Sequence, residues 1–173
     1  MKFQQIKSII KVLKVKIKYK GVTLSLKQNI EGLLKLSVHG DGTICIGDCG
    51  NFRNGTQLIS EGKLIIGKHF FCNQNVSITC MNDIRIGDYV EIANNVVIVD
   101  HDHDYRSRNH GEYTFGKVIV GNNVWIGANV VILRNTTIGD NVVIGAGSIV
   151  SGQIPNNTVY YQKRDTVIKP FQM

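Results

Sequence analysis

The sequence predicts an all-β chain in which short strands coil around a single core. The main observation is a six-residue period, because residues 120–155 form six consecutive units of six residues. Each unit opens with an aliphatic residue, and these are Val120, Ile126, Ile132, Ile138, Ile144 and Val150. A period of six fits neither a helix stripe, which repeats near 3.6 residues, nor a simple two-residue alternation. It fits flat faces with one inward aliphatic residue each, followed by a small residue where the backbone turns.

Length and composition agree with one β-rich domain. The chain has 173 residues, among them 18 Gly and two Pro, and only 8% are aromatic. One core of this size can be well buried, and Val and Ile with small turn residues favour strands joined by tight corners. We predict a basic cap or arm at residues 1–30, the coil domain at 31–160 and a C-terminal tail at 161–173.

The positive charge lies at the N-terminus. Residues 1–30 carry eight Lys and no acidic residue, whereas the rest of the chain has 12 Lys and Arg against 13 Asp and Glu. Such a segment can bind nucleic acid, an anionic membrane or an acidic polymer. The chain shows neither a nucleic-acid motif nor a basic stripe with interleaved aromatic residues, so we expect no nucleic-acid partner.

The same segment combines two patterns. Residues 1–14 predict a short basic amphipathic helix, with apolar residues at Phe3, Ile6, Ile10 and Leu13. Residues 14–19 alternate between Lys and apolar residues, which predicts a strand that ends at Gly21. We favour a cap that covers the open end of the first coil against edge pairing. The alternative is weak contact of residues 1–20 with an anionic membrane surface.

The cysteines indicate a reducing compartment. The chain has four cysteines, and no two of them form a CxxC motif. They are Cys45, Cys49, Cys72 and Cys80. Cys72 falls where an inward aliphatic residue would lie, so we expect a small buried hydrophobe there and no metal. The chain has neither an apolar segment with a cleavage site nor 18 apolar residues in a row. We expect a cytoplasmic protein, with the inner membrane face as a peripheral location if the basic segment binds lipid.

The period continues in a broken form before residue 100. Three sets of residues six apart begin at Ile46, Ile66 and Ile86, which are 20 residues apart. Three units of six make 18, so we place the two extra residues of each coil at corners near 61–63 and 81–83. The sequence thus predicts three coils here and two more in 120–155, stacked as a solenoid.

Between Ile98 and Val120 the period stops. Residues 100–117 read DHDHDYRSRNHGEYTFGK and contain three His, three Asp and two Arg. Polar chemistry gathered in a loop ejected from a rigid scaffold is where function is expected. We therefore predict a functional loop here, with a merely solvated loop as the alternative.

Several stretches resemble the hexapeptide-repeat acyltransferases, in particular the sugar and xenobiotic O-acetyltransferases such as galactoside and maltose acetyltransferases. They are FCNQN (71–75), IGDYVEIANNV (86–96), the His-bearing loop, GNNVWIGANVVI (121–132) and IGDNVVIGAGSIV (138–150). The resemblance covers about residues 40–160 and implies a left-handed parallel β-helix. It also implies a homotrimer, with the active site between subunits, that moves acetyl directly from acetyl-CoA to a sugar hydroxyl. We expect the acceptor to be a bacterial surface polysaccharide or its precursor.

Transfer to a hydroxyl needs a base, because an alcohol is a poor nucleophile at neutral pH. The resemblance places the catalytic base at His101, and His103 is the competing candidate. A carboxylate could hold the imidazole tautomer, although strand alternation would direct the neighbours of His101 away from it. The candidates are Asp100, Asp102 and Asp104. By the same resemblance Asn73 contacts the acceptor, and the loop offers further acceptor contacts at His103, Tyr105, Arg106 and Arg108.

The coenzyme arm needs small side chains where it passes along exposed backbone. The resemblance implies a coenzyme A site, which we predict at Trp125, Ala128, Ala146, Ser151, Lys163 and Arg164. The chain departs from the family where a Lys near the coenzyme is replaced by Gly152. We expect Lys163 and Arg164 to supply that charge at a phosphate.

Two other classes of function are kept. Some hexapeptide β-helices are zinc-dependent carbonic anhydrases of the γ class, and nitrogen ligands could come from His69, His101, His103 and His110. The loop does not give the ligand spacing of that class, so we predict no metal. The other class is a non-catalytic scaffold subunit, which the His-bearing loop and the small-residue channel argue against.

Overall fold

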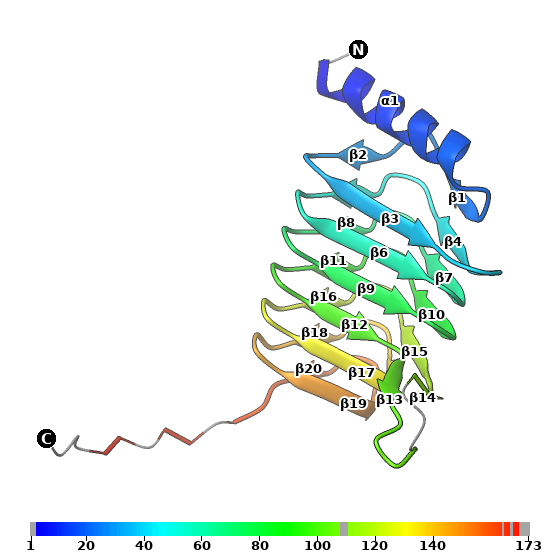
Figure 1. The fold of residues 1–173 in the computed structure, drawn as a ribbon. Coiled ribbons are helices and arrows are strands. Elements are labelled where there is room, and N and C mark those ends of the chain that lie inside the picture. Colours follow the sequence, from blue (N-terminus) through cyan, green and yellow to red (C-terminus); the bar gives the residue numbers. More distant parts are fainter. Residues whose placement is uncertain (1–2, 108–110, 164, 167, 170–173) are drawn as a thin grey trace, which may run out of the picture.

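The computed structural model describes residues 3–107, 111–163, 165–166 and 168–169. After one helix, α1 (Phe3–Lys18), short strands coil into a prism whose coils lie one below another (Figure 1). The strands pair in parallel with the equivalent strands of neighbouring coils, so the protein is a parallel β-helix. The fold class predicted from the six-residue period is confirmed.

Strands recur in threes along the chain and build three walls. The first wall contains β1 (Val22–Leu24), β4 (Thr43–Ile46), β7 (Lys63–Ile66), β10 (Asp83–Ile86) and β15 (Lys117–Val120). The second wall contains β2 (Asn29–Ile30), β5 (Asn51–Phe52), β8 (Phe71–Cys72), β11 (Glu91–Ile92), β16 (Trp125–Ile126), β18 (Val143–Ile144) and β20 (Val159–Tyr160). The third wall contains β3 (Leu34–Val38), β6 (Thr56–Ser60), β9 (Ser77–Cys80) and β12 (Val97–Val99). The longer strands β17 (Val131–Ile138) and β19 (Ile149–Ile154) run from the third wall into the first.

The core is the stack of inward residues. In the second wall, Ile92 pairs with Cys72 of the preceding coil and with Ile126 of the following coil, and all three side chains are fully buried. Cys72 therefore takes the place of an aliphatic residue, as predicted. The extra residues also lie where the sequence places them, because turns at 61–62 and 81–82 separate the third wall from the first.

Asparagine at the corners explains the Asn-rich repeat. Asn75, Asn95 and Asn129 all have φ near +60°, a region that Asn tolerates better than most residues. The Asn75 amide donates to Asn95, and the Asn95 amide donates to Asn129, at 3.3 and 3.2 Å. Each such side chain therefore turns its own coil and bonds to the next one.

The N-terminal segment differs from its predicted form. One helix continues to Lys18, so the strand predicted at residues 14–19 is wrong. The alternation suggested that strand, but Val15 and Tyr19 also stand one helical turn apart, and both pack against the core. Ile17, which a strand would place on the same side as Val15 and Tyr19, is instead 86% exposed.

Helix α1 covers the open end of the first coil. Val12 is fully buried, and the Ile30 amide donates to Ser8 Oγ at 3.0 Å. The Lys11 ammonium donates to the carbonyl oxygens of Ile30 and Gly32. The first coil begins at Val22, so the β-helix extends further toward the N-terminus than the repeat pattern indicates. In the part of the chain that the structure describes, no helix is long and apolar enough to cross a membrane.

Replacing Ile126 by Ala should lower the free energy of unfolding by about 2–5 kcal/mol, because it opens a cavity between Ile92 and Ile144. Urea denaturation measures this change. The matched control is Ile149→Ala, whose side chain is 51% exposed and should lose about 1 kcal/mol or less. Equal losses in the two variants would contradict the stacked core.

Candidate active site

The loop that breaks the period forms a hairpin on one edge of the prism. Strand β13 (His101–His103) pairs antiparallel with β14 (Tyr113–Phe115), between β12 of the third wall and β15 of the first. The hairpin lies toward the end of the prism opposite α1 (Figure 1). We call this corner, with residues 81–82, 133–135 and 151–152, the hairpin edge.

A buried carboxylate anchors the base of the hairpin. Asp100 is fully buried and accepts hydrogen bonds from the Met81 and Asn82 amides of the preceding coil, both at 2.8 Å. The Gly116 amide donates to the Asp100 carbonyl where the chain returns to the wall. Asp100 therefore holds the hairpin to the preceding coil.

The same carboxylate contacts the predicted base. Asp100 Oδ1 lies 3.2 Å from His101 Nδ1, although strand alternation suggested that neighbours of His101 point away from it. Alternation does not apply here because Asp100 lies where the chain turns out of the wall. The other two candidates have different partners: Asp102 accepts from Arg134 Nε at 2.5 Å, and Asp104 accepts from the Arg106 amide at 3.0 Å.

The arrangement gives the two nitrogens of His101 different roles. A carboxylate facing Nδ1 favours the tautomer with its proton on Nδ1, which leaves the lone pair of Nε2 to accept a proton. The imidazole is 16% exposed and makes an edge-to-face contact with the Tyr113 ring, with the two ring centres 5.6 Å apart. His103 is exposed on the same strand, and its ring lies 4.7 Å from that of Tyr113. His101 is thus the held imidazole, and His103 is the exposed one.

The far part of the hairpin presents the predicted acceptor contacts to solvent. Tyr105 is 84% exposed, and the Arg106 guanidinium lies 5.4 Å from its ring centre. Arg106 Nε also donates to the Tyr105 hydroxyl at 3.3 Å. Arg108 and His110 lie outside the described residues.

Other predicted residues share a different corner, between the second and third walls. This second edge contains Asn73 after β8, Ala128 after β16 and Ala146 after β18. The Gly147 amide donates to the Ala128 carbonyl at 2.8 Å, so these two turns lie directly against each other. Asn73 is half-buried and its side-chain oxygen accepts from the Gln74 amide.

The second edge is smooth because its turns are closely packed. A Cβ atom on Gly127 would lie 2.6 Å from the Ala146 amide nitrogen, so only glycine fits there. Trp125 stands on the outer face of the second wall beside this edge and is 54% exposed. The small side chains leave exposed backbone along which an extended amide-bearing ligand can lie.

The remaining predicted coenzyme contacts lie elsewhere. Ser151 is exposed on the hairpin edge, in the same corner as Arg134. Gly152 has a φ of +83°, which glycine adopts without strain. Lys163 is exposed after β20, and Arg164 lies outside the described residues.

One chain does not bring the two edges together. The third wall separates Asn73 from the Asp100 contact at Met81, a span of roughly 20 Å for extended strand. The sequence contained this signal, because residues 76–80 show strand alternation between the two corners. Sequence reasoning did not single out Tyr113 and Arg134, although Arg134 is the third residue of its six-residue unit, where the other units have Asn, Ala, Asp or Gly.

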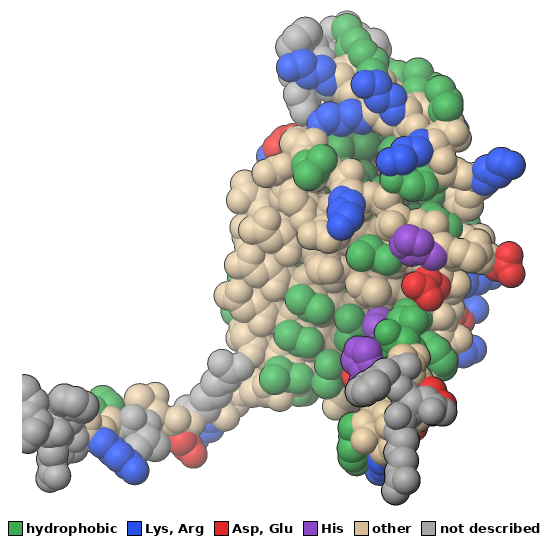
Figure 2. Space-filling model, in the orientation of Figure 1, with side chains coloured by type: hydrophobic (Ala, Val, Ile, Leu, Met, Phe, Trp, Pro, Cys, Tyr) green, Lys and Arg blue, Asp and Glu red, His purple; other side chains and the backbone are tan. Residues whose placement is uncertain are grey.

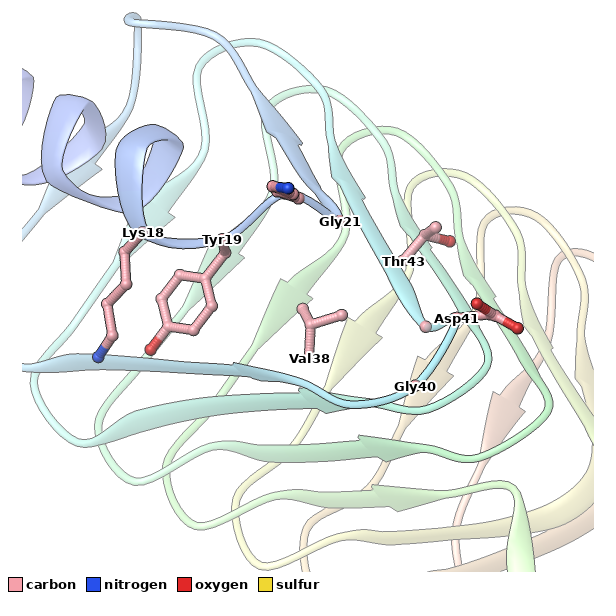
Figure 3. Close-up of a pocket in the computed structure, with 9 residues that line it drawn as sticks. Lys18, Tyr19, Gly21, Val38, Gly40, Asp41 and Thr43 are labelled. Carbon is pink, nitrogen blue, oxygen red and sulfur yellow. The ribbon is translucent and has the colours of Figure 1, made fainter.

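A hollow of about 430 Å³ lies at the N-terminal end of the prism, where α1 meets the first coil (Figure 3). Its lining includes Lys18, Tyr19, Val38 and Asp41. It contains none of the predicted site residues. Among the described residues, no three His, Cys, Asp or Glu side chains gather in a group that could hold a metal ion.

Comparisons with known proteins find similarity to hexapeptide-repeat transferases. The family model described as bacterial transferase hexapeptide (six repeats) matches residues 117–152. The galactoside O-acetyltransferase of Escherichia coli K12 is 47% identical over 96 residues, which cover 54% of this chain and 47% of that protein. The putative lipopolysaccharide biosynthesis O-acetyl transferase WbbJ of the same organism is 32% identical over 151 residues, which cover 78% of this chain and 75% of that protein. The chain thus spans about half the length of the first relative and three quarters of the second.

Solved structures extend the similarity to nearly the whole chain. A maltose O-acetyltransferase from Clostridium difficile 630 has a TM-score of 0.52 at 28% identity, covering 99% of this chain and 90% of that one. A galactoside acetyltransferase in complex with coenzyme A has a TM-score of 0.56 at 27% identity, covering 94% and 80%. The N-acyltransferase AntD from Bacillus cereus shares the fold, with a TM-score of 0.69 at 21% identity, covering 87% and 83%.

Cysteine labelling tests the buried environment behind the hairpin. Burial, and then the negative charge of Asp100, raise the pKa of Cys80 to about 12, while burial raises the pKa of Cys72 to about 11. Because the thiolate reacts, at pH 8 these two thiols should resist a disulfide reagent while the exposed Cys49 reacts. Mass spectrometry after labelling of native and denatured protein measures this difference. Labelling of Cys80 in the native protein as fast as Cys49 would contradict the described environment.

Proposed function

The chain belongs to the hexapeptide-repeat transferases, and we propose that it transfers acetyl from acetyl-CoA to a hydroxyl group of a sugar. The observation that carries this proposal is the buried Asp100 carboxylate facing Nδ1 of His101 on the ejected hairpin. Similarity to two sugar O-acetyltransferases and to the putative lipopolysaccharide enzyme supports the same reaction class.

The proposed mechanism is direct transfer with His101 as general base. Nε2 of His101 takes the proton of the acceptor hydroxyl as its oxygen attacks the thioester carbonyl. Asp100 stabilises the imidazolium ion that forms, as a carboxylate does for a catalytic imidazole. The bond between the carbonyl carbon and sulfur breaks, and the proton passes from His101 to the leaving thiolate. Atoms balance without an acyl-enzyme, since the products are the acetyl ester and free coenzyme A.

We place the donor along the second edge. Ala128 and Ala146 leave room for the extended arm of the coenzyme, and its amides can exchange hydrogen bonds with the exposed backbone. The solved galactoside acetyltransferase that holds coenzyme A supports a donor site in this fold. Trp125 lies beside the arm, and Ser151, Lys163 and Arg164 are the proposed contacts toward the other end of the coenzyme.

The two edges of one chain require a second copy to complete the site. We propose a homotrimer in which the hairpin edge of one subunit lies against the second edge of its neighbour. A head-to-tail contact of this kind closes into a ring of identical interfaces. His101 of one subunit then meets Asn73 and the donor edge of the next, although a single chain keeps them roughly 20 Å apart.

The proposed acceptor is a sugar of a bacterial surface polysaccharide or its precursor. The similarity to WbbJ over three quarters of that protein supports this class. The exposed Tyr105 and Arg106 offer a ring face and a cation to a sugar that approaches His101. We propose that the reaction takes place in the cytoplasm, where the four free cysteines would stay reduced.

His101→Ala should lower acetyl-CoA turnover with sugar acceptors by about a hundredfold or more, the usual scale for losing a general base. Release of free coenzyme A thiol measures turnover. The matched control is His103→Ala on the same strand, which should lose about tenfold or less because its imidazole faces no buried carboxylate. Unchanged turnover in His101→Ala, with a large loss in His103→Ala, would move the base to His103.

Complementation between subunits tests the shared site. His101→Ala removes the base, and Ala146→Trp should block the donor edge, because Ala146 is exposed and a large side chain there reaches into solvent. Each variant alone should be inactive. Trimers assembled from equal amounts of both should regain about a quarter of wild-type turnover, since that share of neighbouring pairs has an intact His101 and an intact Ala146. A site within one chain would give no recovery, because neither chain carries both intact parts.

A further inference from the structure

We propose that the outer face of α1 binds the surface of an anionic lipid bilayer. This helix has two apolar faces. The inner face holds Val12 and Val15 against the first coil. The outer face carries four exposed residues, Ile6, Ile10, Leu13 and Ile17, whose exposed fractions are 41%, 47%, 45% and 86%.

The outer residues form one stripe. They follow one another at intervals of four, three and four residues, which places them on the same side of an α-helix. A helix that only capped the prism would carry polar residues on this side, because water covers it. A continuous apolar stripe on an exposed face instead indicates an interaction surface.

Lysines accompany this stripe. Lys7, Lys14 and Lys18 are exposed along one flank of the helix, while Lys11 is held by the first coil. Figure 2 shows lysine and hydrophobic side chains side by side on α1. Residues 1–30 contain eight Lys and no acidic residue. The surface therefore matches a partner that combines negative charge with an apolar interior.

A hollow beside the lysine flank extends the surface. It has a volume of about 300 Å³ and is lined in part by Lys14, Lys18, Val15 and Leu33. Leu33 is 68% exposed, so the apolar lining is open to solvent. A phosphate at the rim can meet the two ammonium groups while hydrocarbon covers the leucine.

A bilayer fits these features better than the other partners of a basic helix. A second α1 would bring lysine flanks of like charge together, and nucleic acid offers no apolar layer for the stripe. The helix has 16 residues, fewer than the roughly 20 that a bilayer crossing requires, so it would lie in the plane of the surface.

The fold then fixes an orientation. α1 lies at one end of the prism, and hairpin β13–β14 lies toward the other end (Figure 1). Binding through α1 would hold the prism to the membrane and leave the hairpin in solution, open to its acceptor. This inference does not depend on the acetyl-transfer proposal.

The experiment is co-sedimentation of the full chain with two kinds of vesicle, phosphatidylcholine alone and an equal mixture of phosphatidylcholine and phosphatidylglycerol. We expect binding to the mixed vesicles only. Raising NaCl from about 0.1 M to about 1 M should weaken it, because the screening length falls from about 10 Å to about 3 Å. Lys14→Glu with Lys18→Glu should lower the partition coefficient about thirtyfold, at about fivefold for each lysine. Ile10→Ser with Leu13→Ser should lower it about tenfold.

Matched controls separate the α1 surface from general charge and fold. Lys63→Glu with Lys68→Glu makes the same charge change on the prism body and should retain binding. Val159→Ser removes an exposed apolar residue far from α1 and should also retain it. All changed side chains are exposed, and circular dichroism should give wild-type melting curves. Turnover of a soluble acceptor checks the proposed activity separately.

Three results would overturn the proposal. The first is no binding of the wild-type chain to mixed vesicles. The second is equal loss of binding in the α1 variants and in the body controls. The third is a wild-type chain that does not bind vesicles and whose molecular mass in solution is larger than that of the Ile10→Ser, Leu13→Ser variant. That result would assign the stripe to a contact with a second copy of this chain.

Discussion

Every coil of the prism rests on the coil before it, and the rest of the structure depends on this stacking. The inward residues of successive coils lie in register, so that Cys72, Ile92 and Ile126 form one column in the core. Backbone amides at the corners also bond to the neighbouring coil. An inserted or deleted residue within a face would shift both the core column and these hydrogen bonds, which is why the period of six persists from β16 to β18, where Ile126 and Ile144 pair 18 residues apart.

The stacked walls leave the corners as the places where the chain can depart from the pattern. The longest departure is hairpin β13–β14. Because the chain leaves the wall at its base, the Met81 and Asn82 amides of the preceding coil need another acceptor. Asp100 satisfies both amides and at the same time meets His101. One buried carboxylate therefore closes the gap in the scaffold and orients the imidazole. Since the third wall separates the two edges, one chain does not bring Asn73 to His101, and the proposed trimer takes the second edge from a neighbouring copy.

The end of the solenoid imposes a different condition. The first coil has a neighbouring coil on one side only, so its other side needs a cover that is not another coil. Helix α1 supplies Val12 to the core and Ser8 and Lys11 to unpaired backbone groups of residues 30–32. This use accounts for the inner face of the helix. It leaves the outer stripe exposed to the surroundings beside the lysine flank.

The sequence by itself determined the β-helix, the corners that hold its extra residues, the buried Cys72 and the ejected loop with His101, because a stacked solenoid repeats each structural requirement at a fixed spacing. It did not show that the first coil begins as early as Val22 or that the loop is a hairpin. It did not determine the conformation of residues 14–19, since Val15 and Tyr19 suit both a strand and a helix until the first coil offers a surface to pack against. It also left three aspartates as partners for His101. Only the tertiary structure selected Asp100, because the selecting groups are backbone amides of another coil, almost twenty residues away in the chain. The separation of the two edges was likewise decided by the width of a wall, which becomes visible only when the strands are folded.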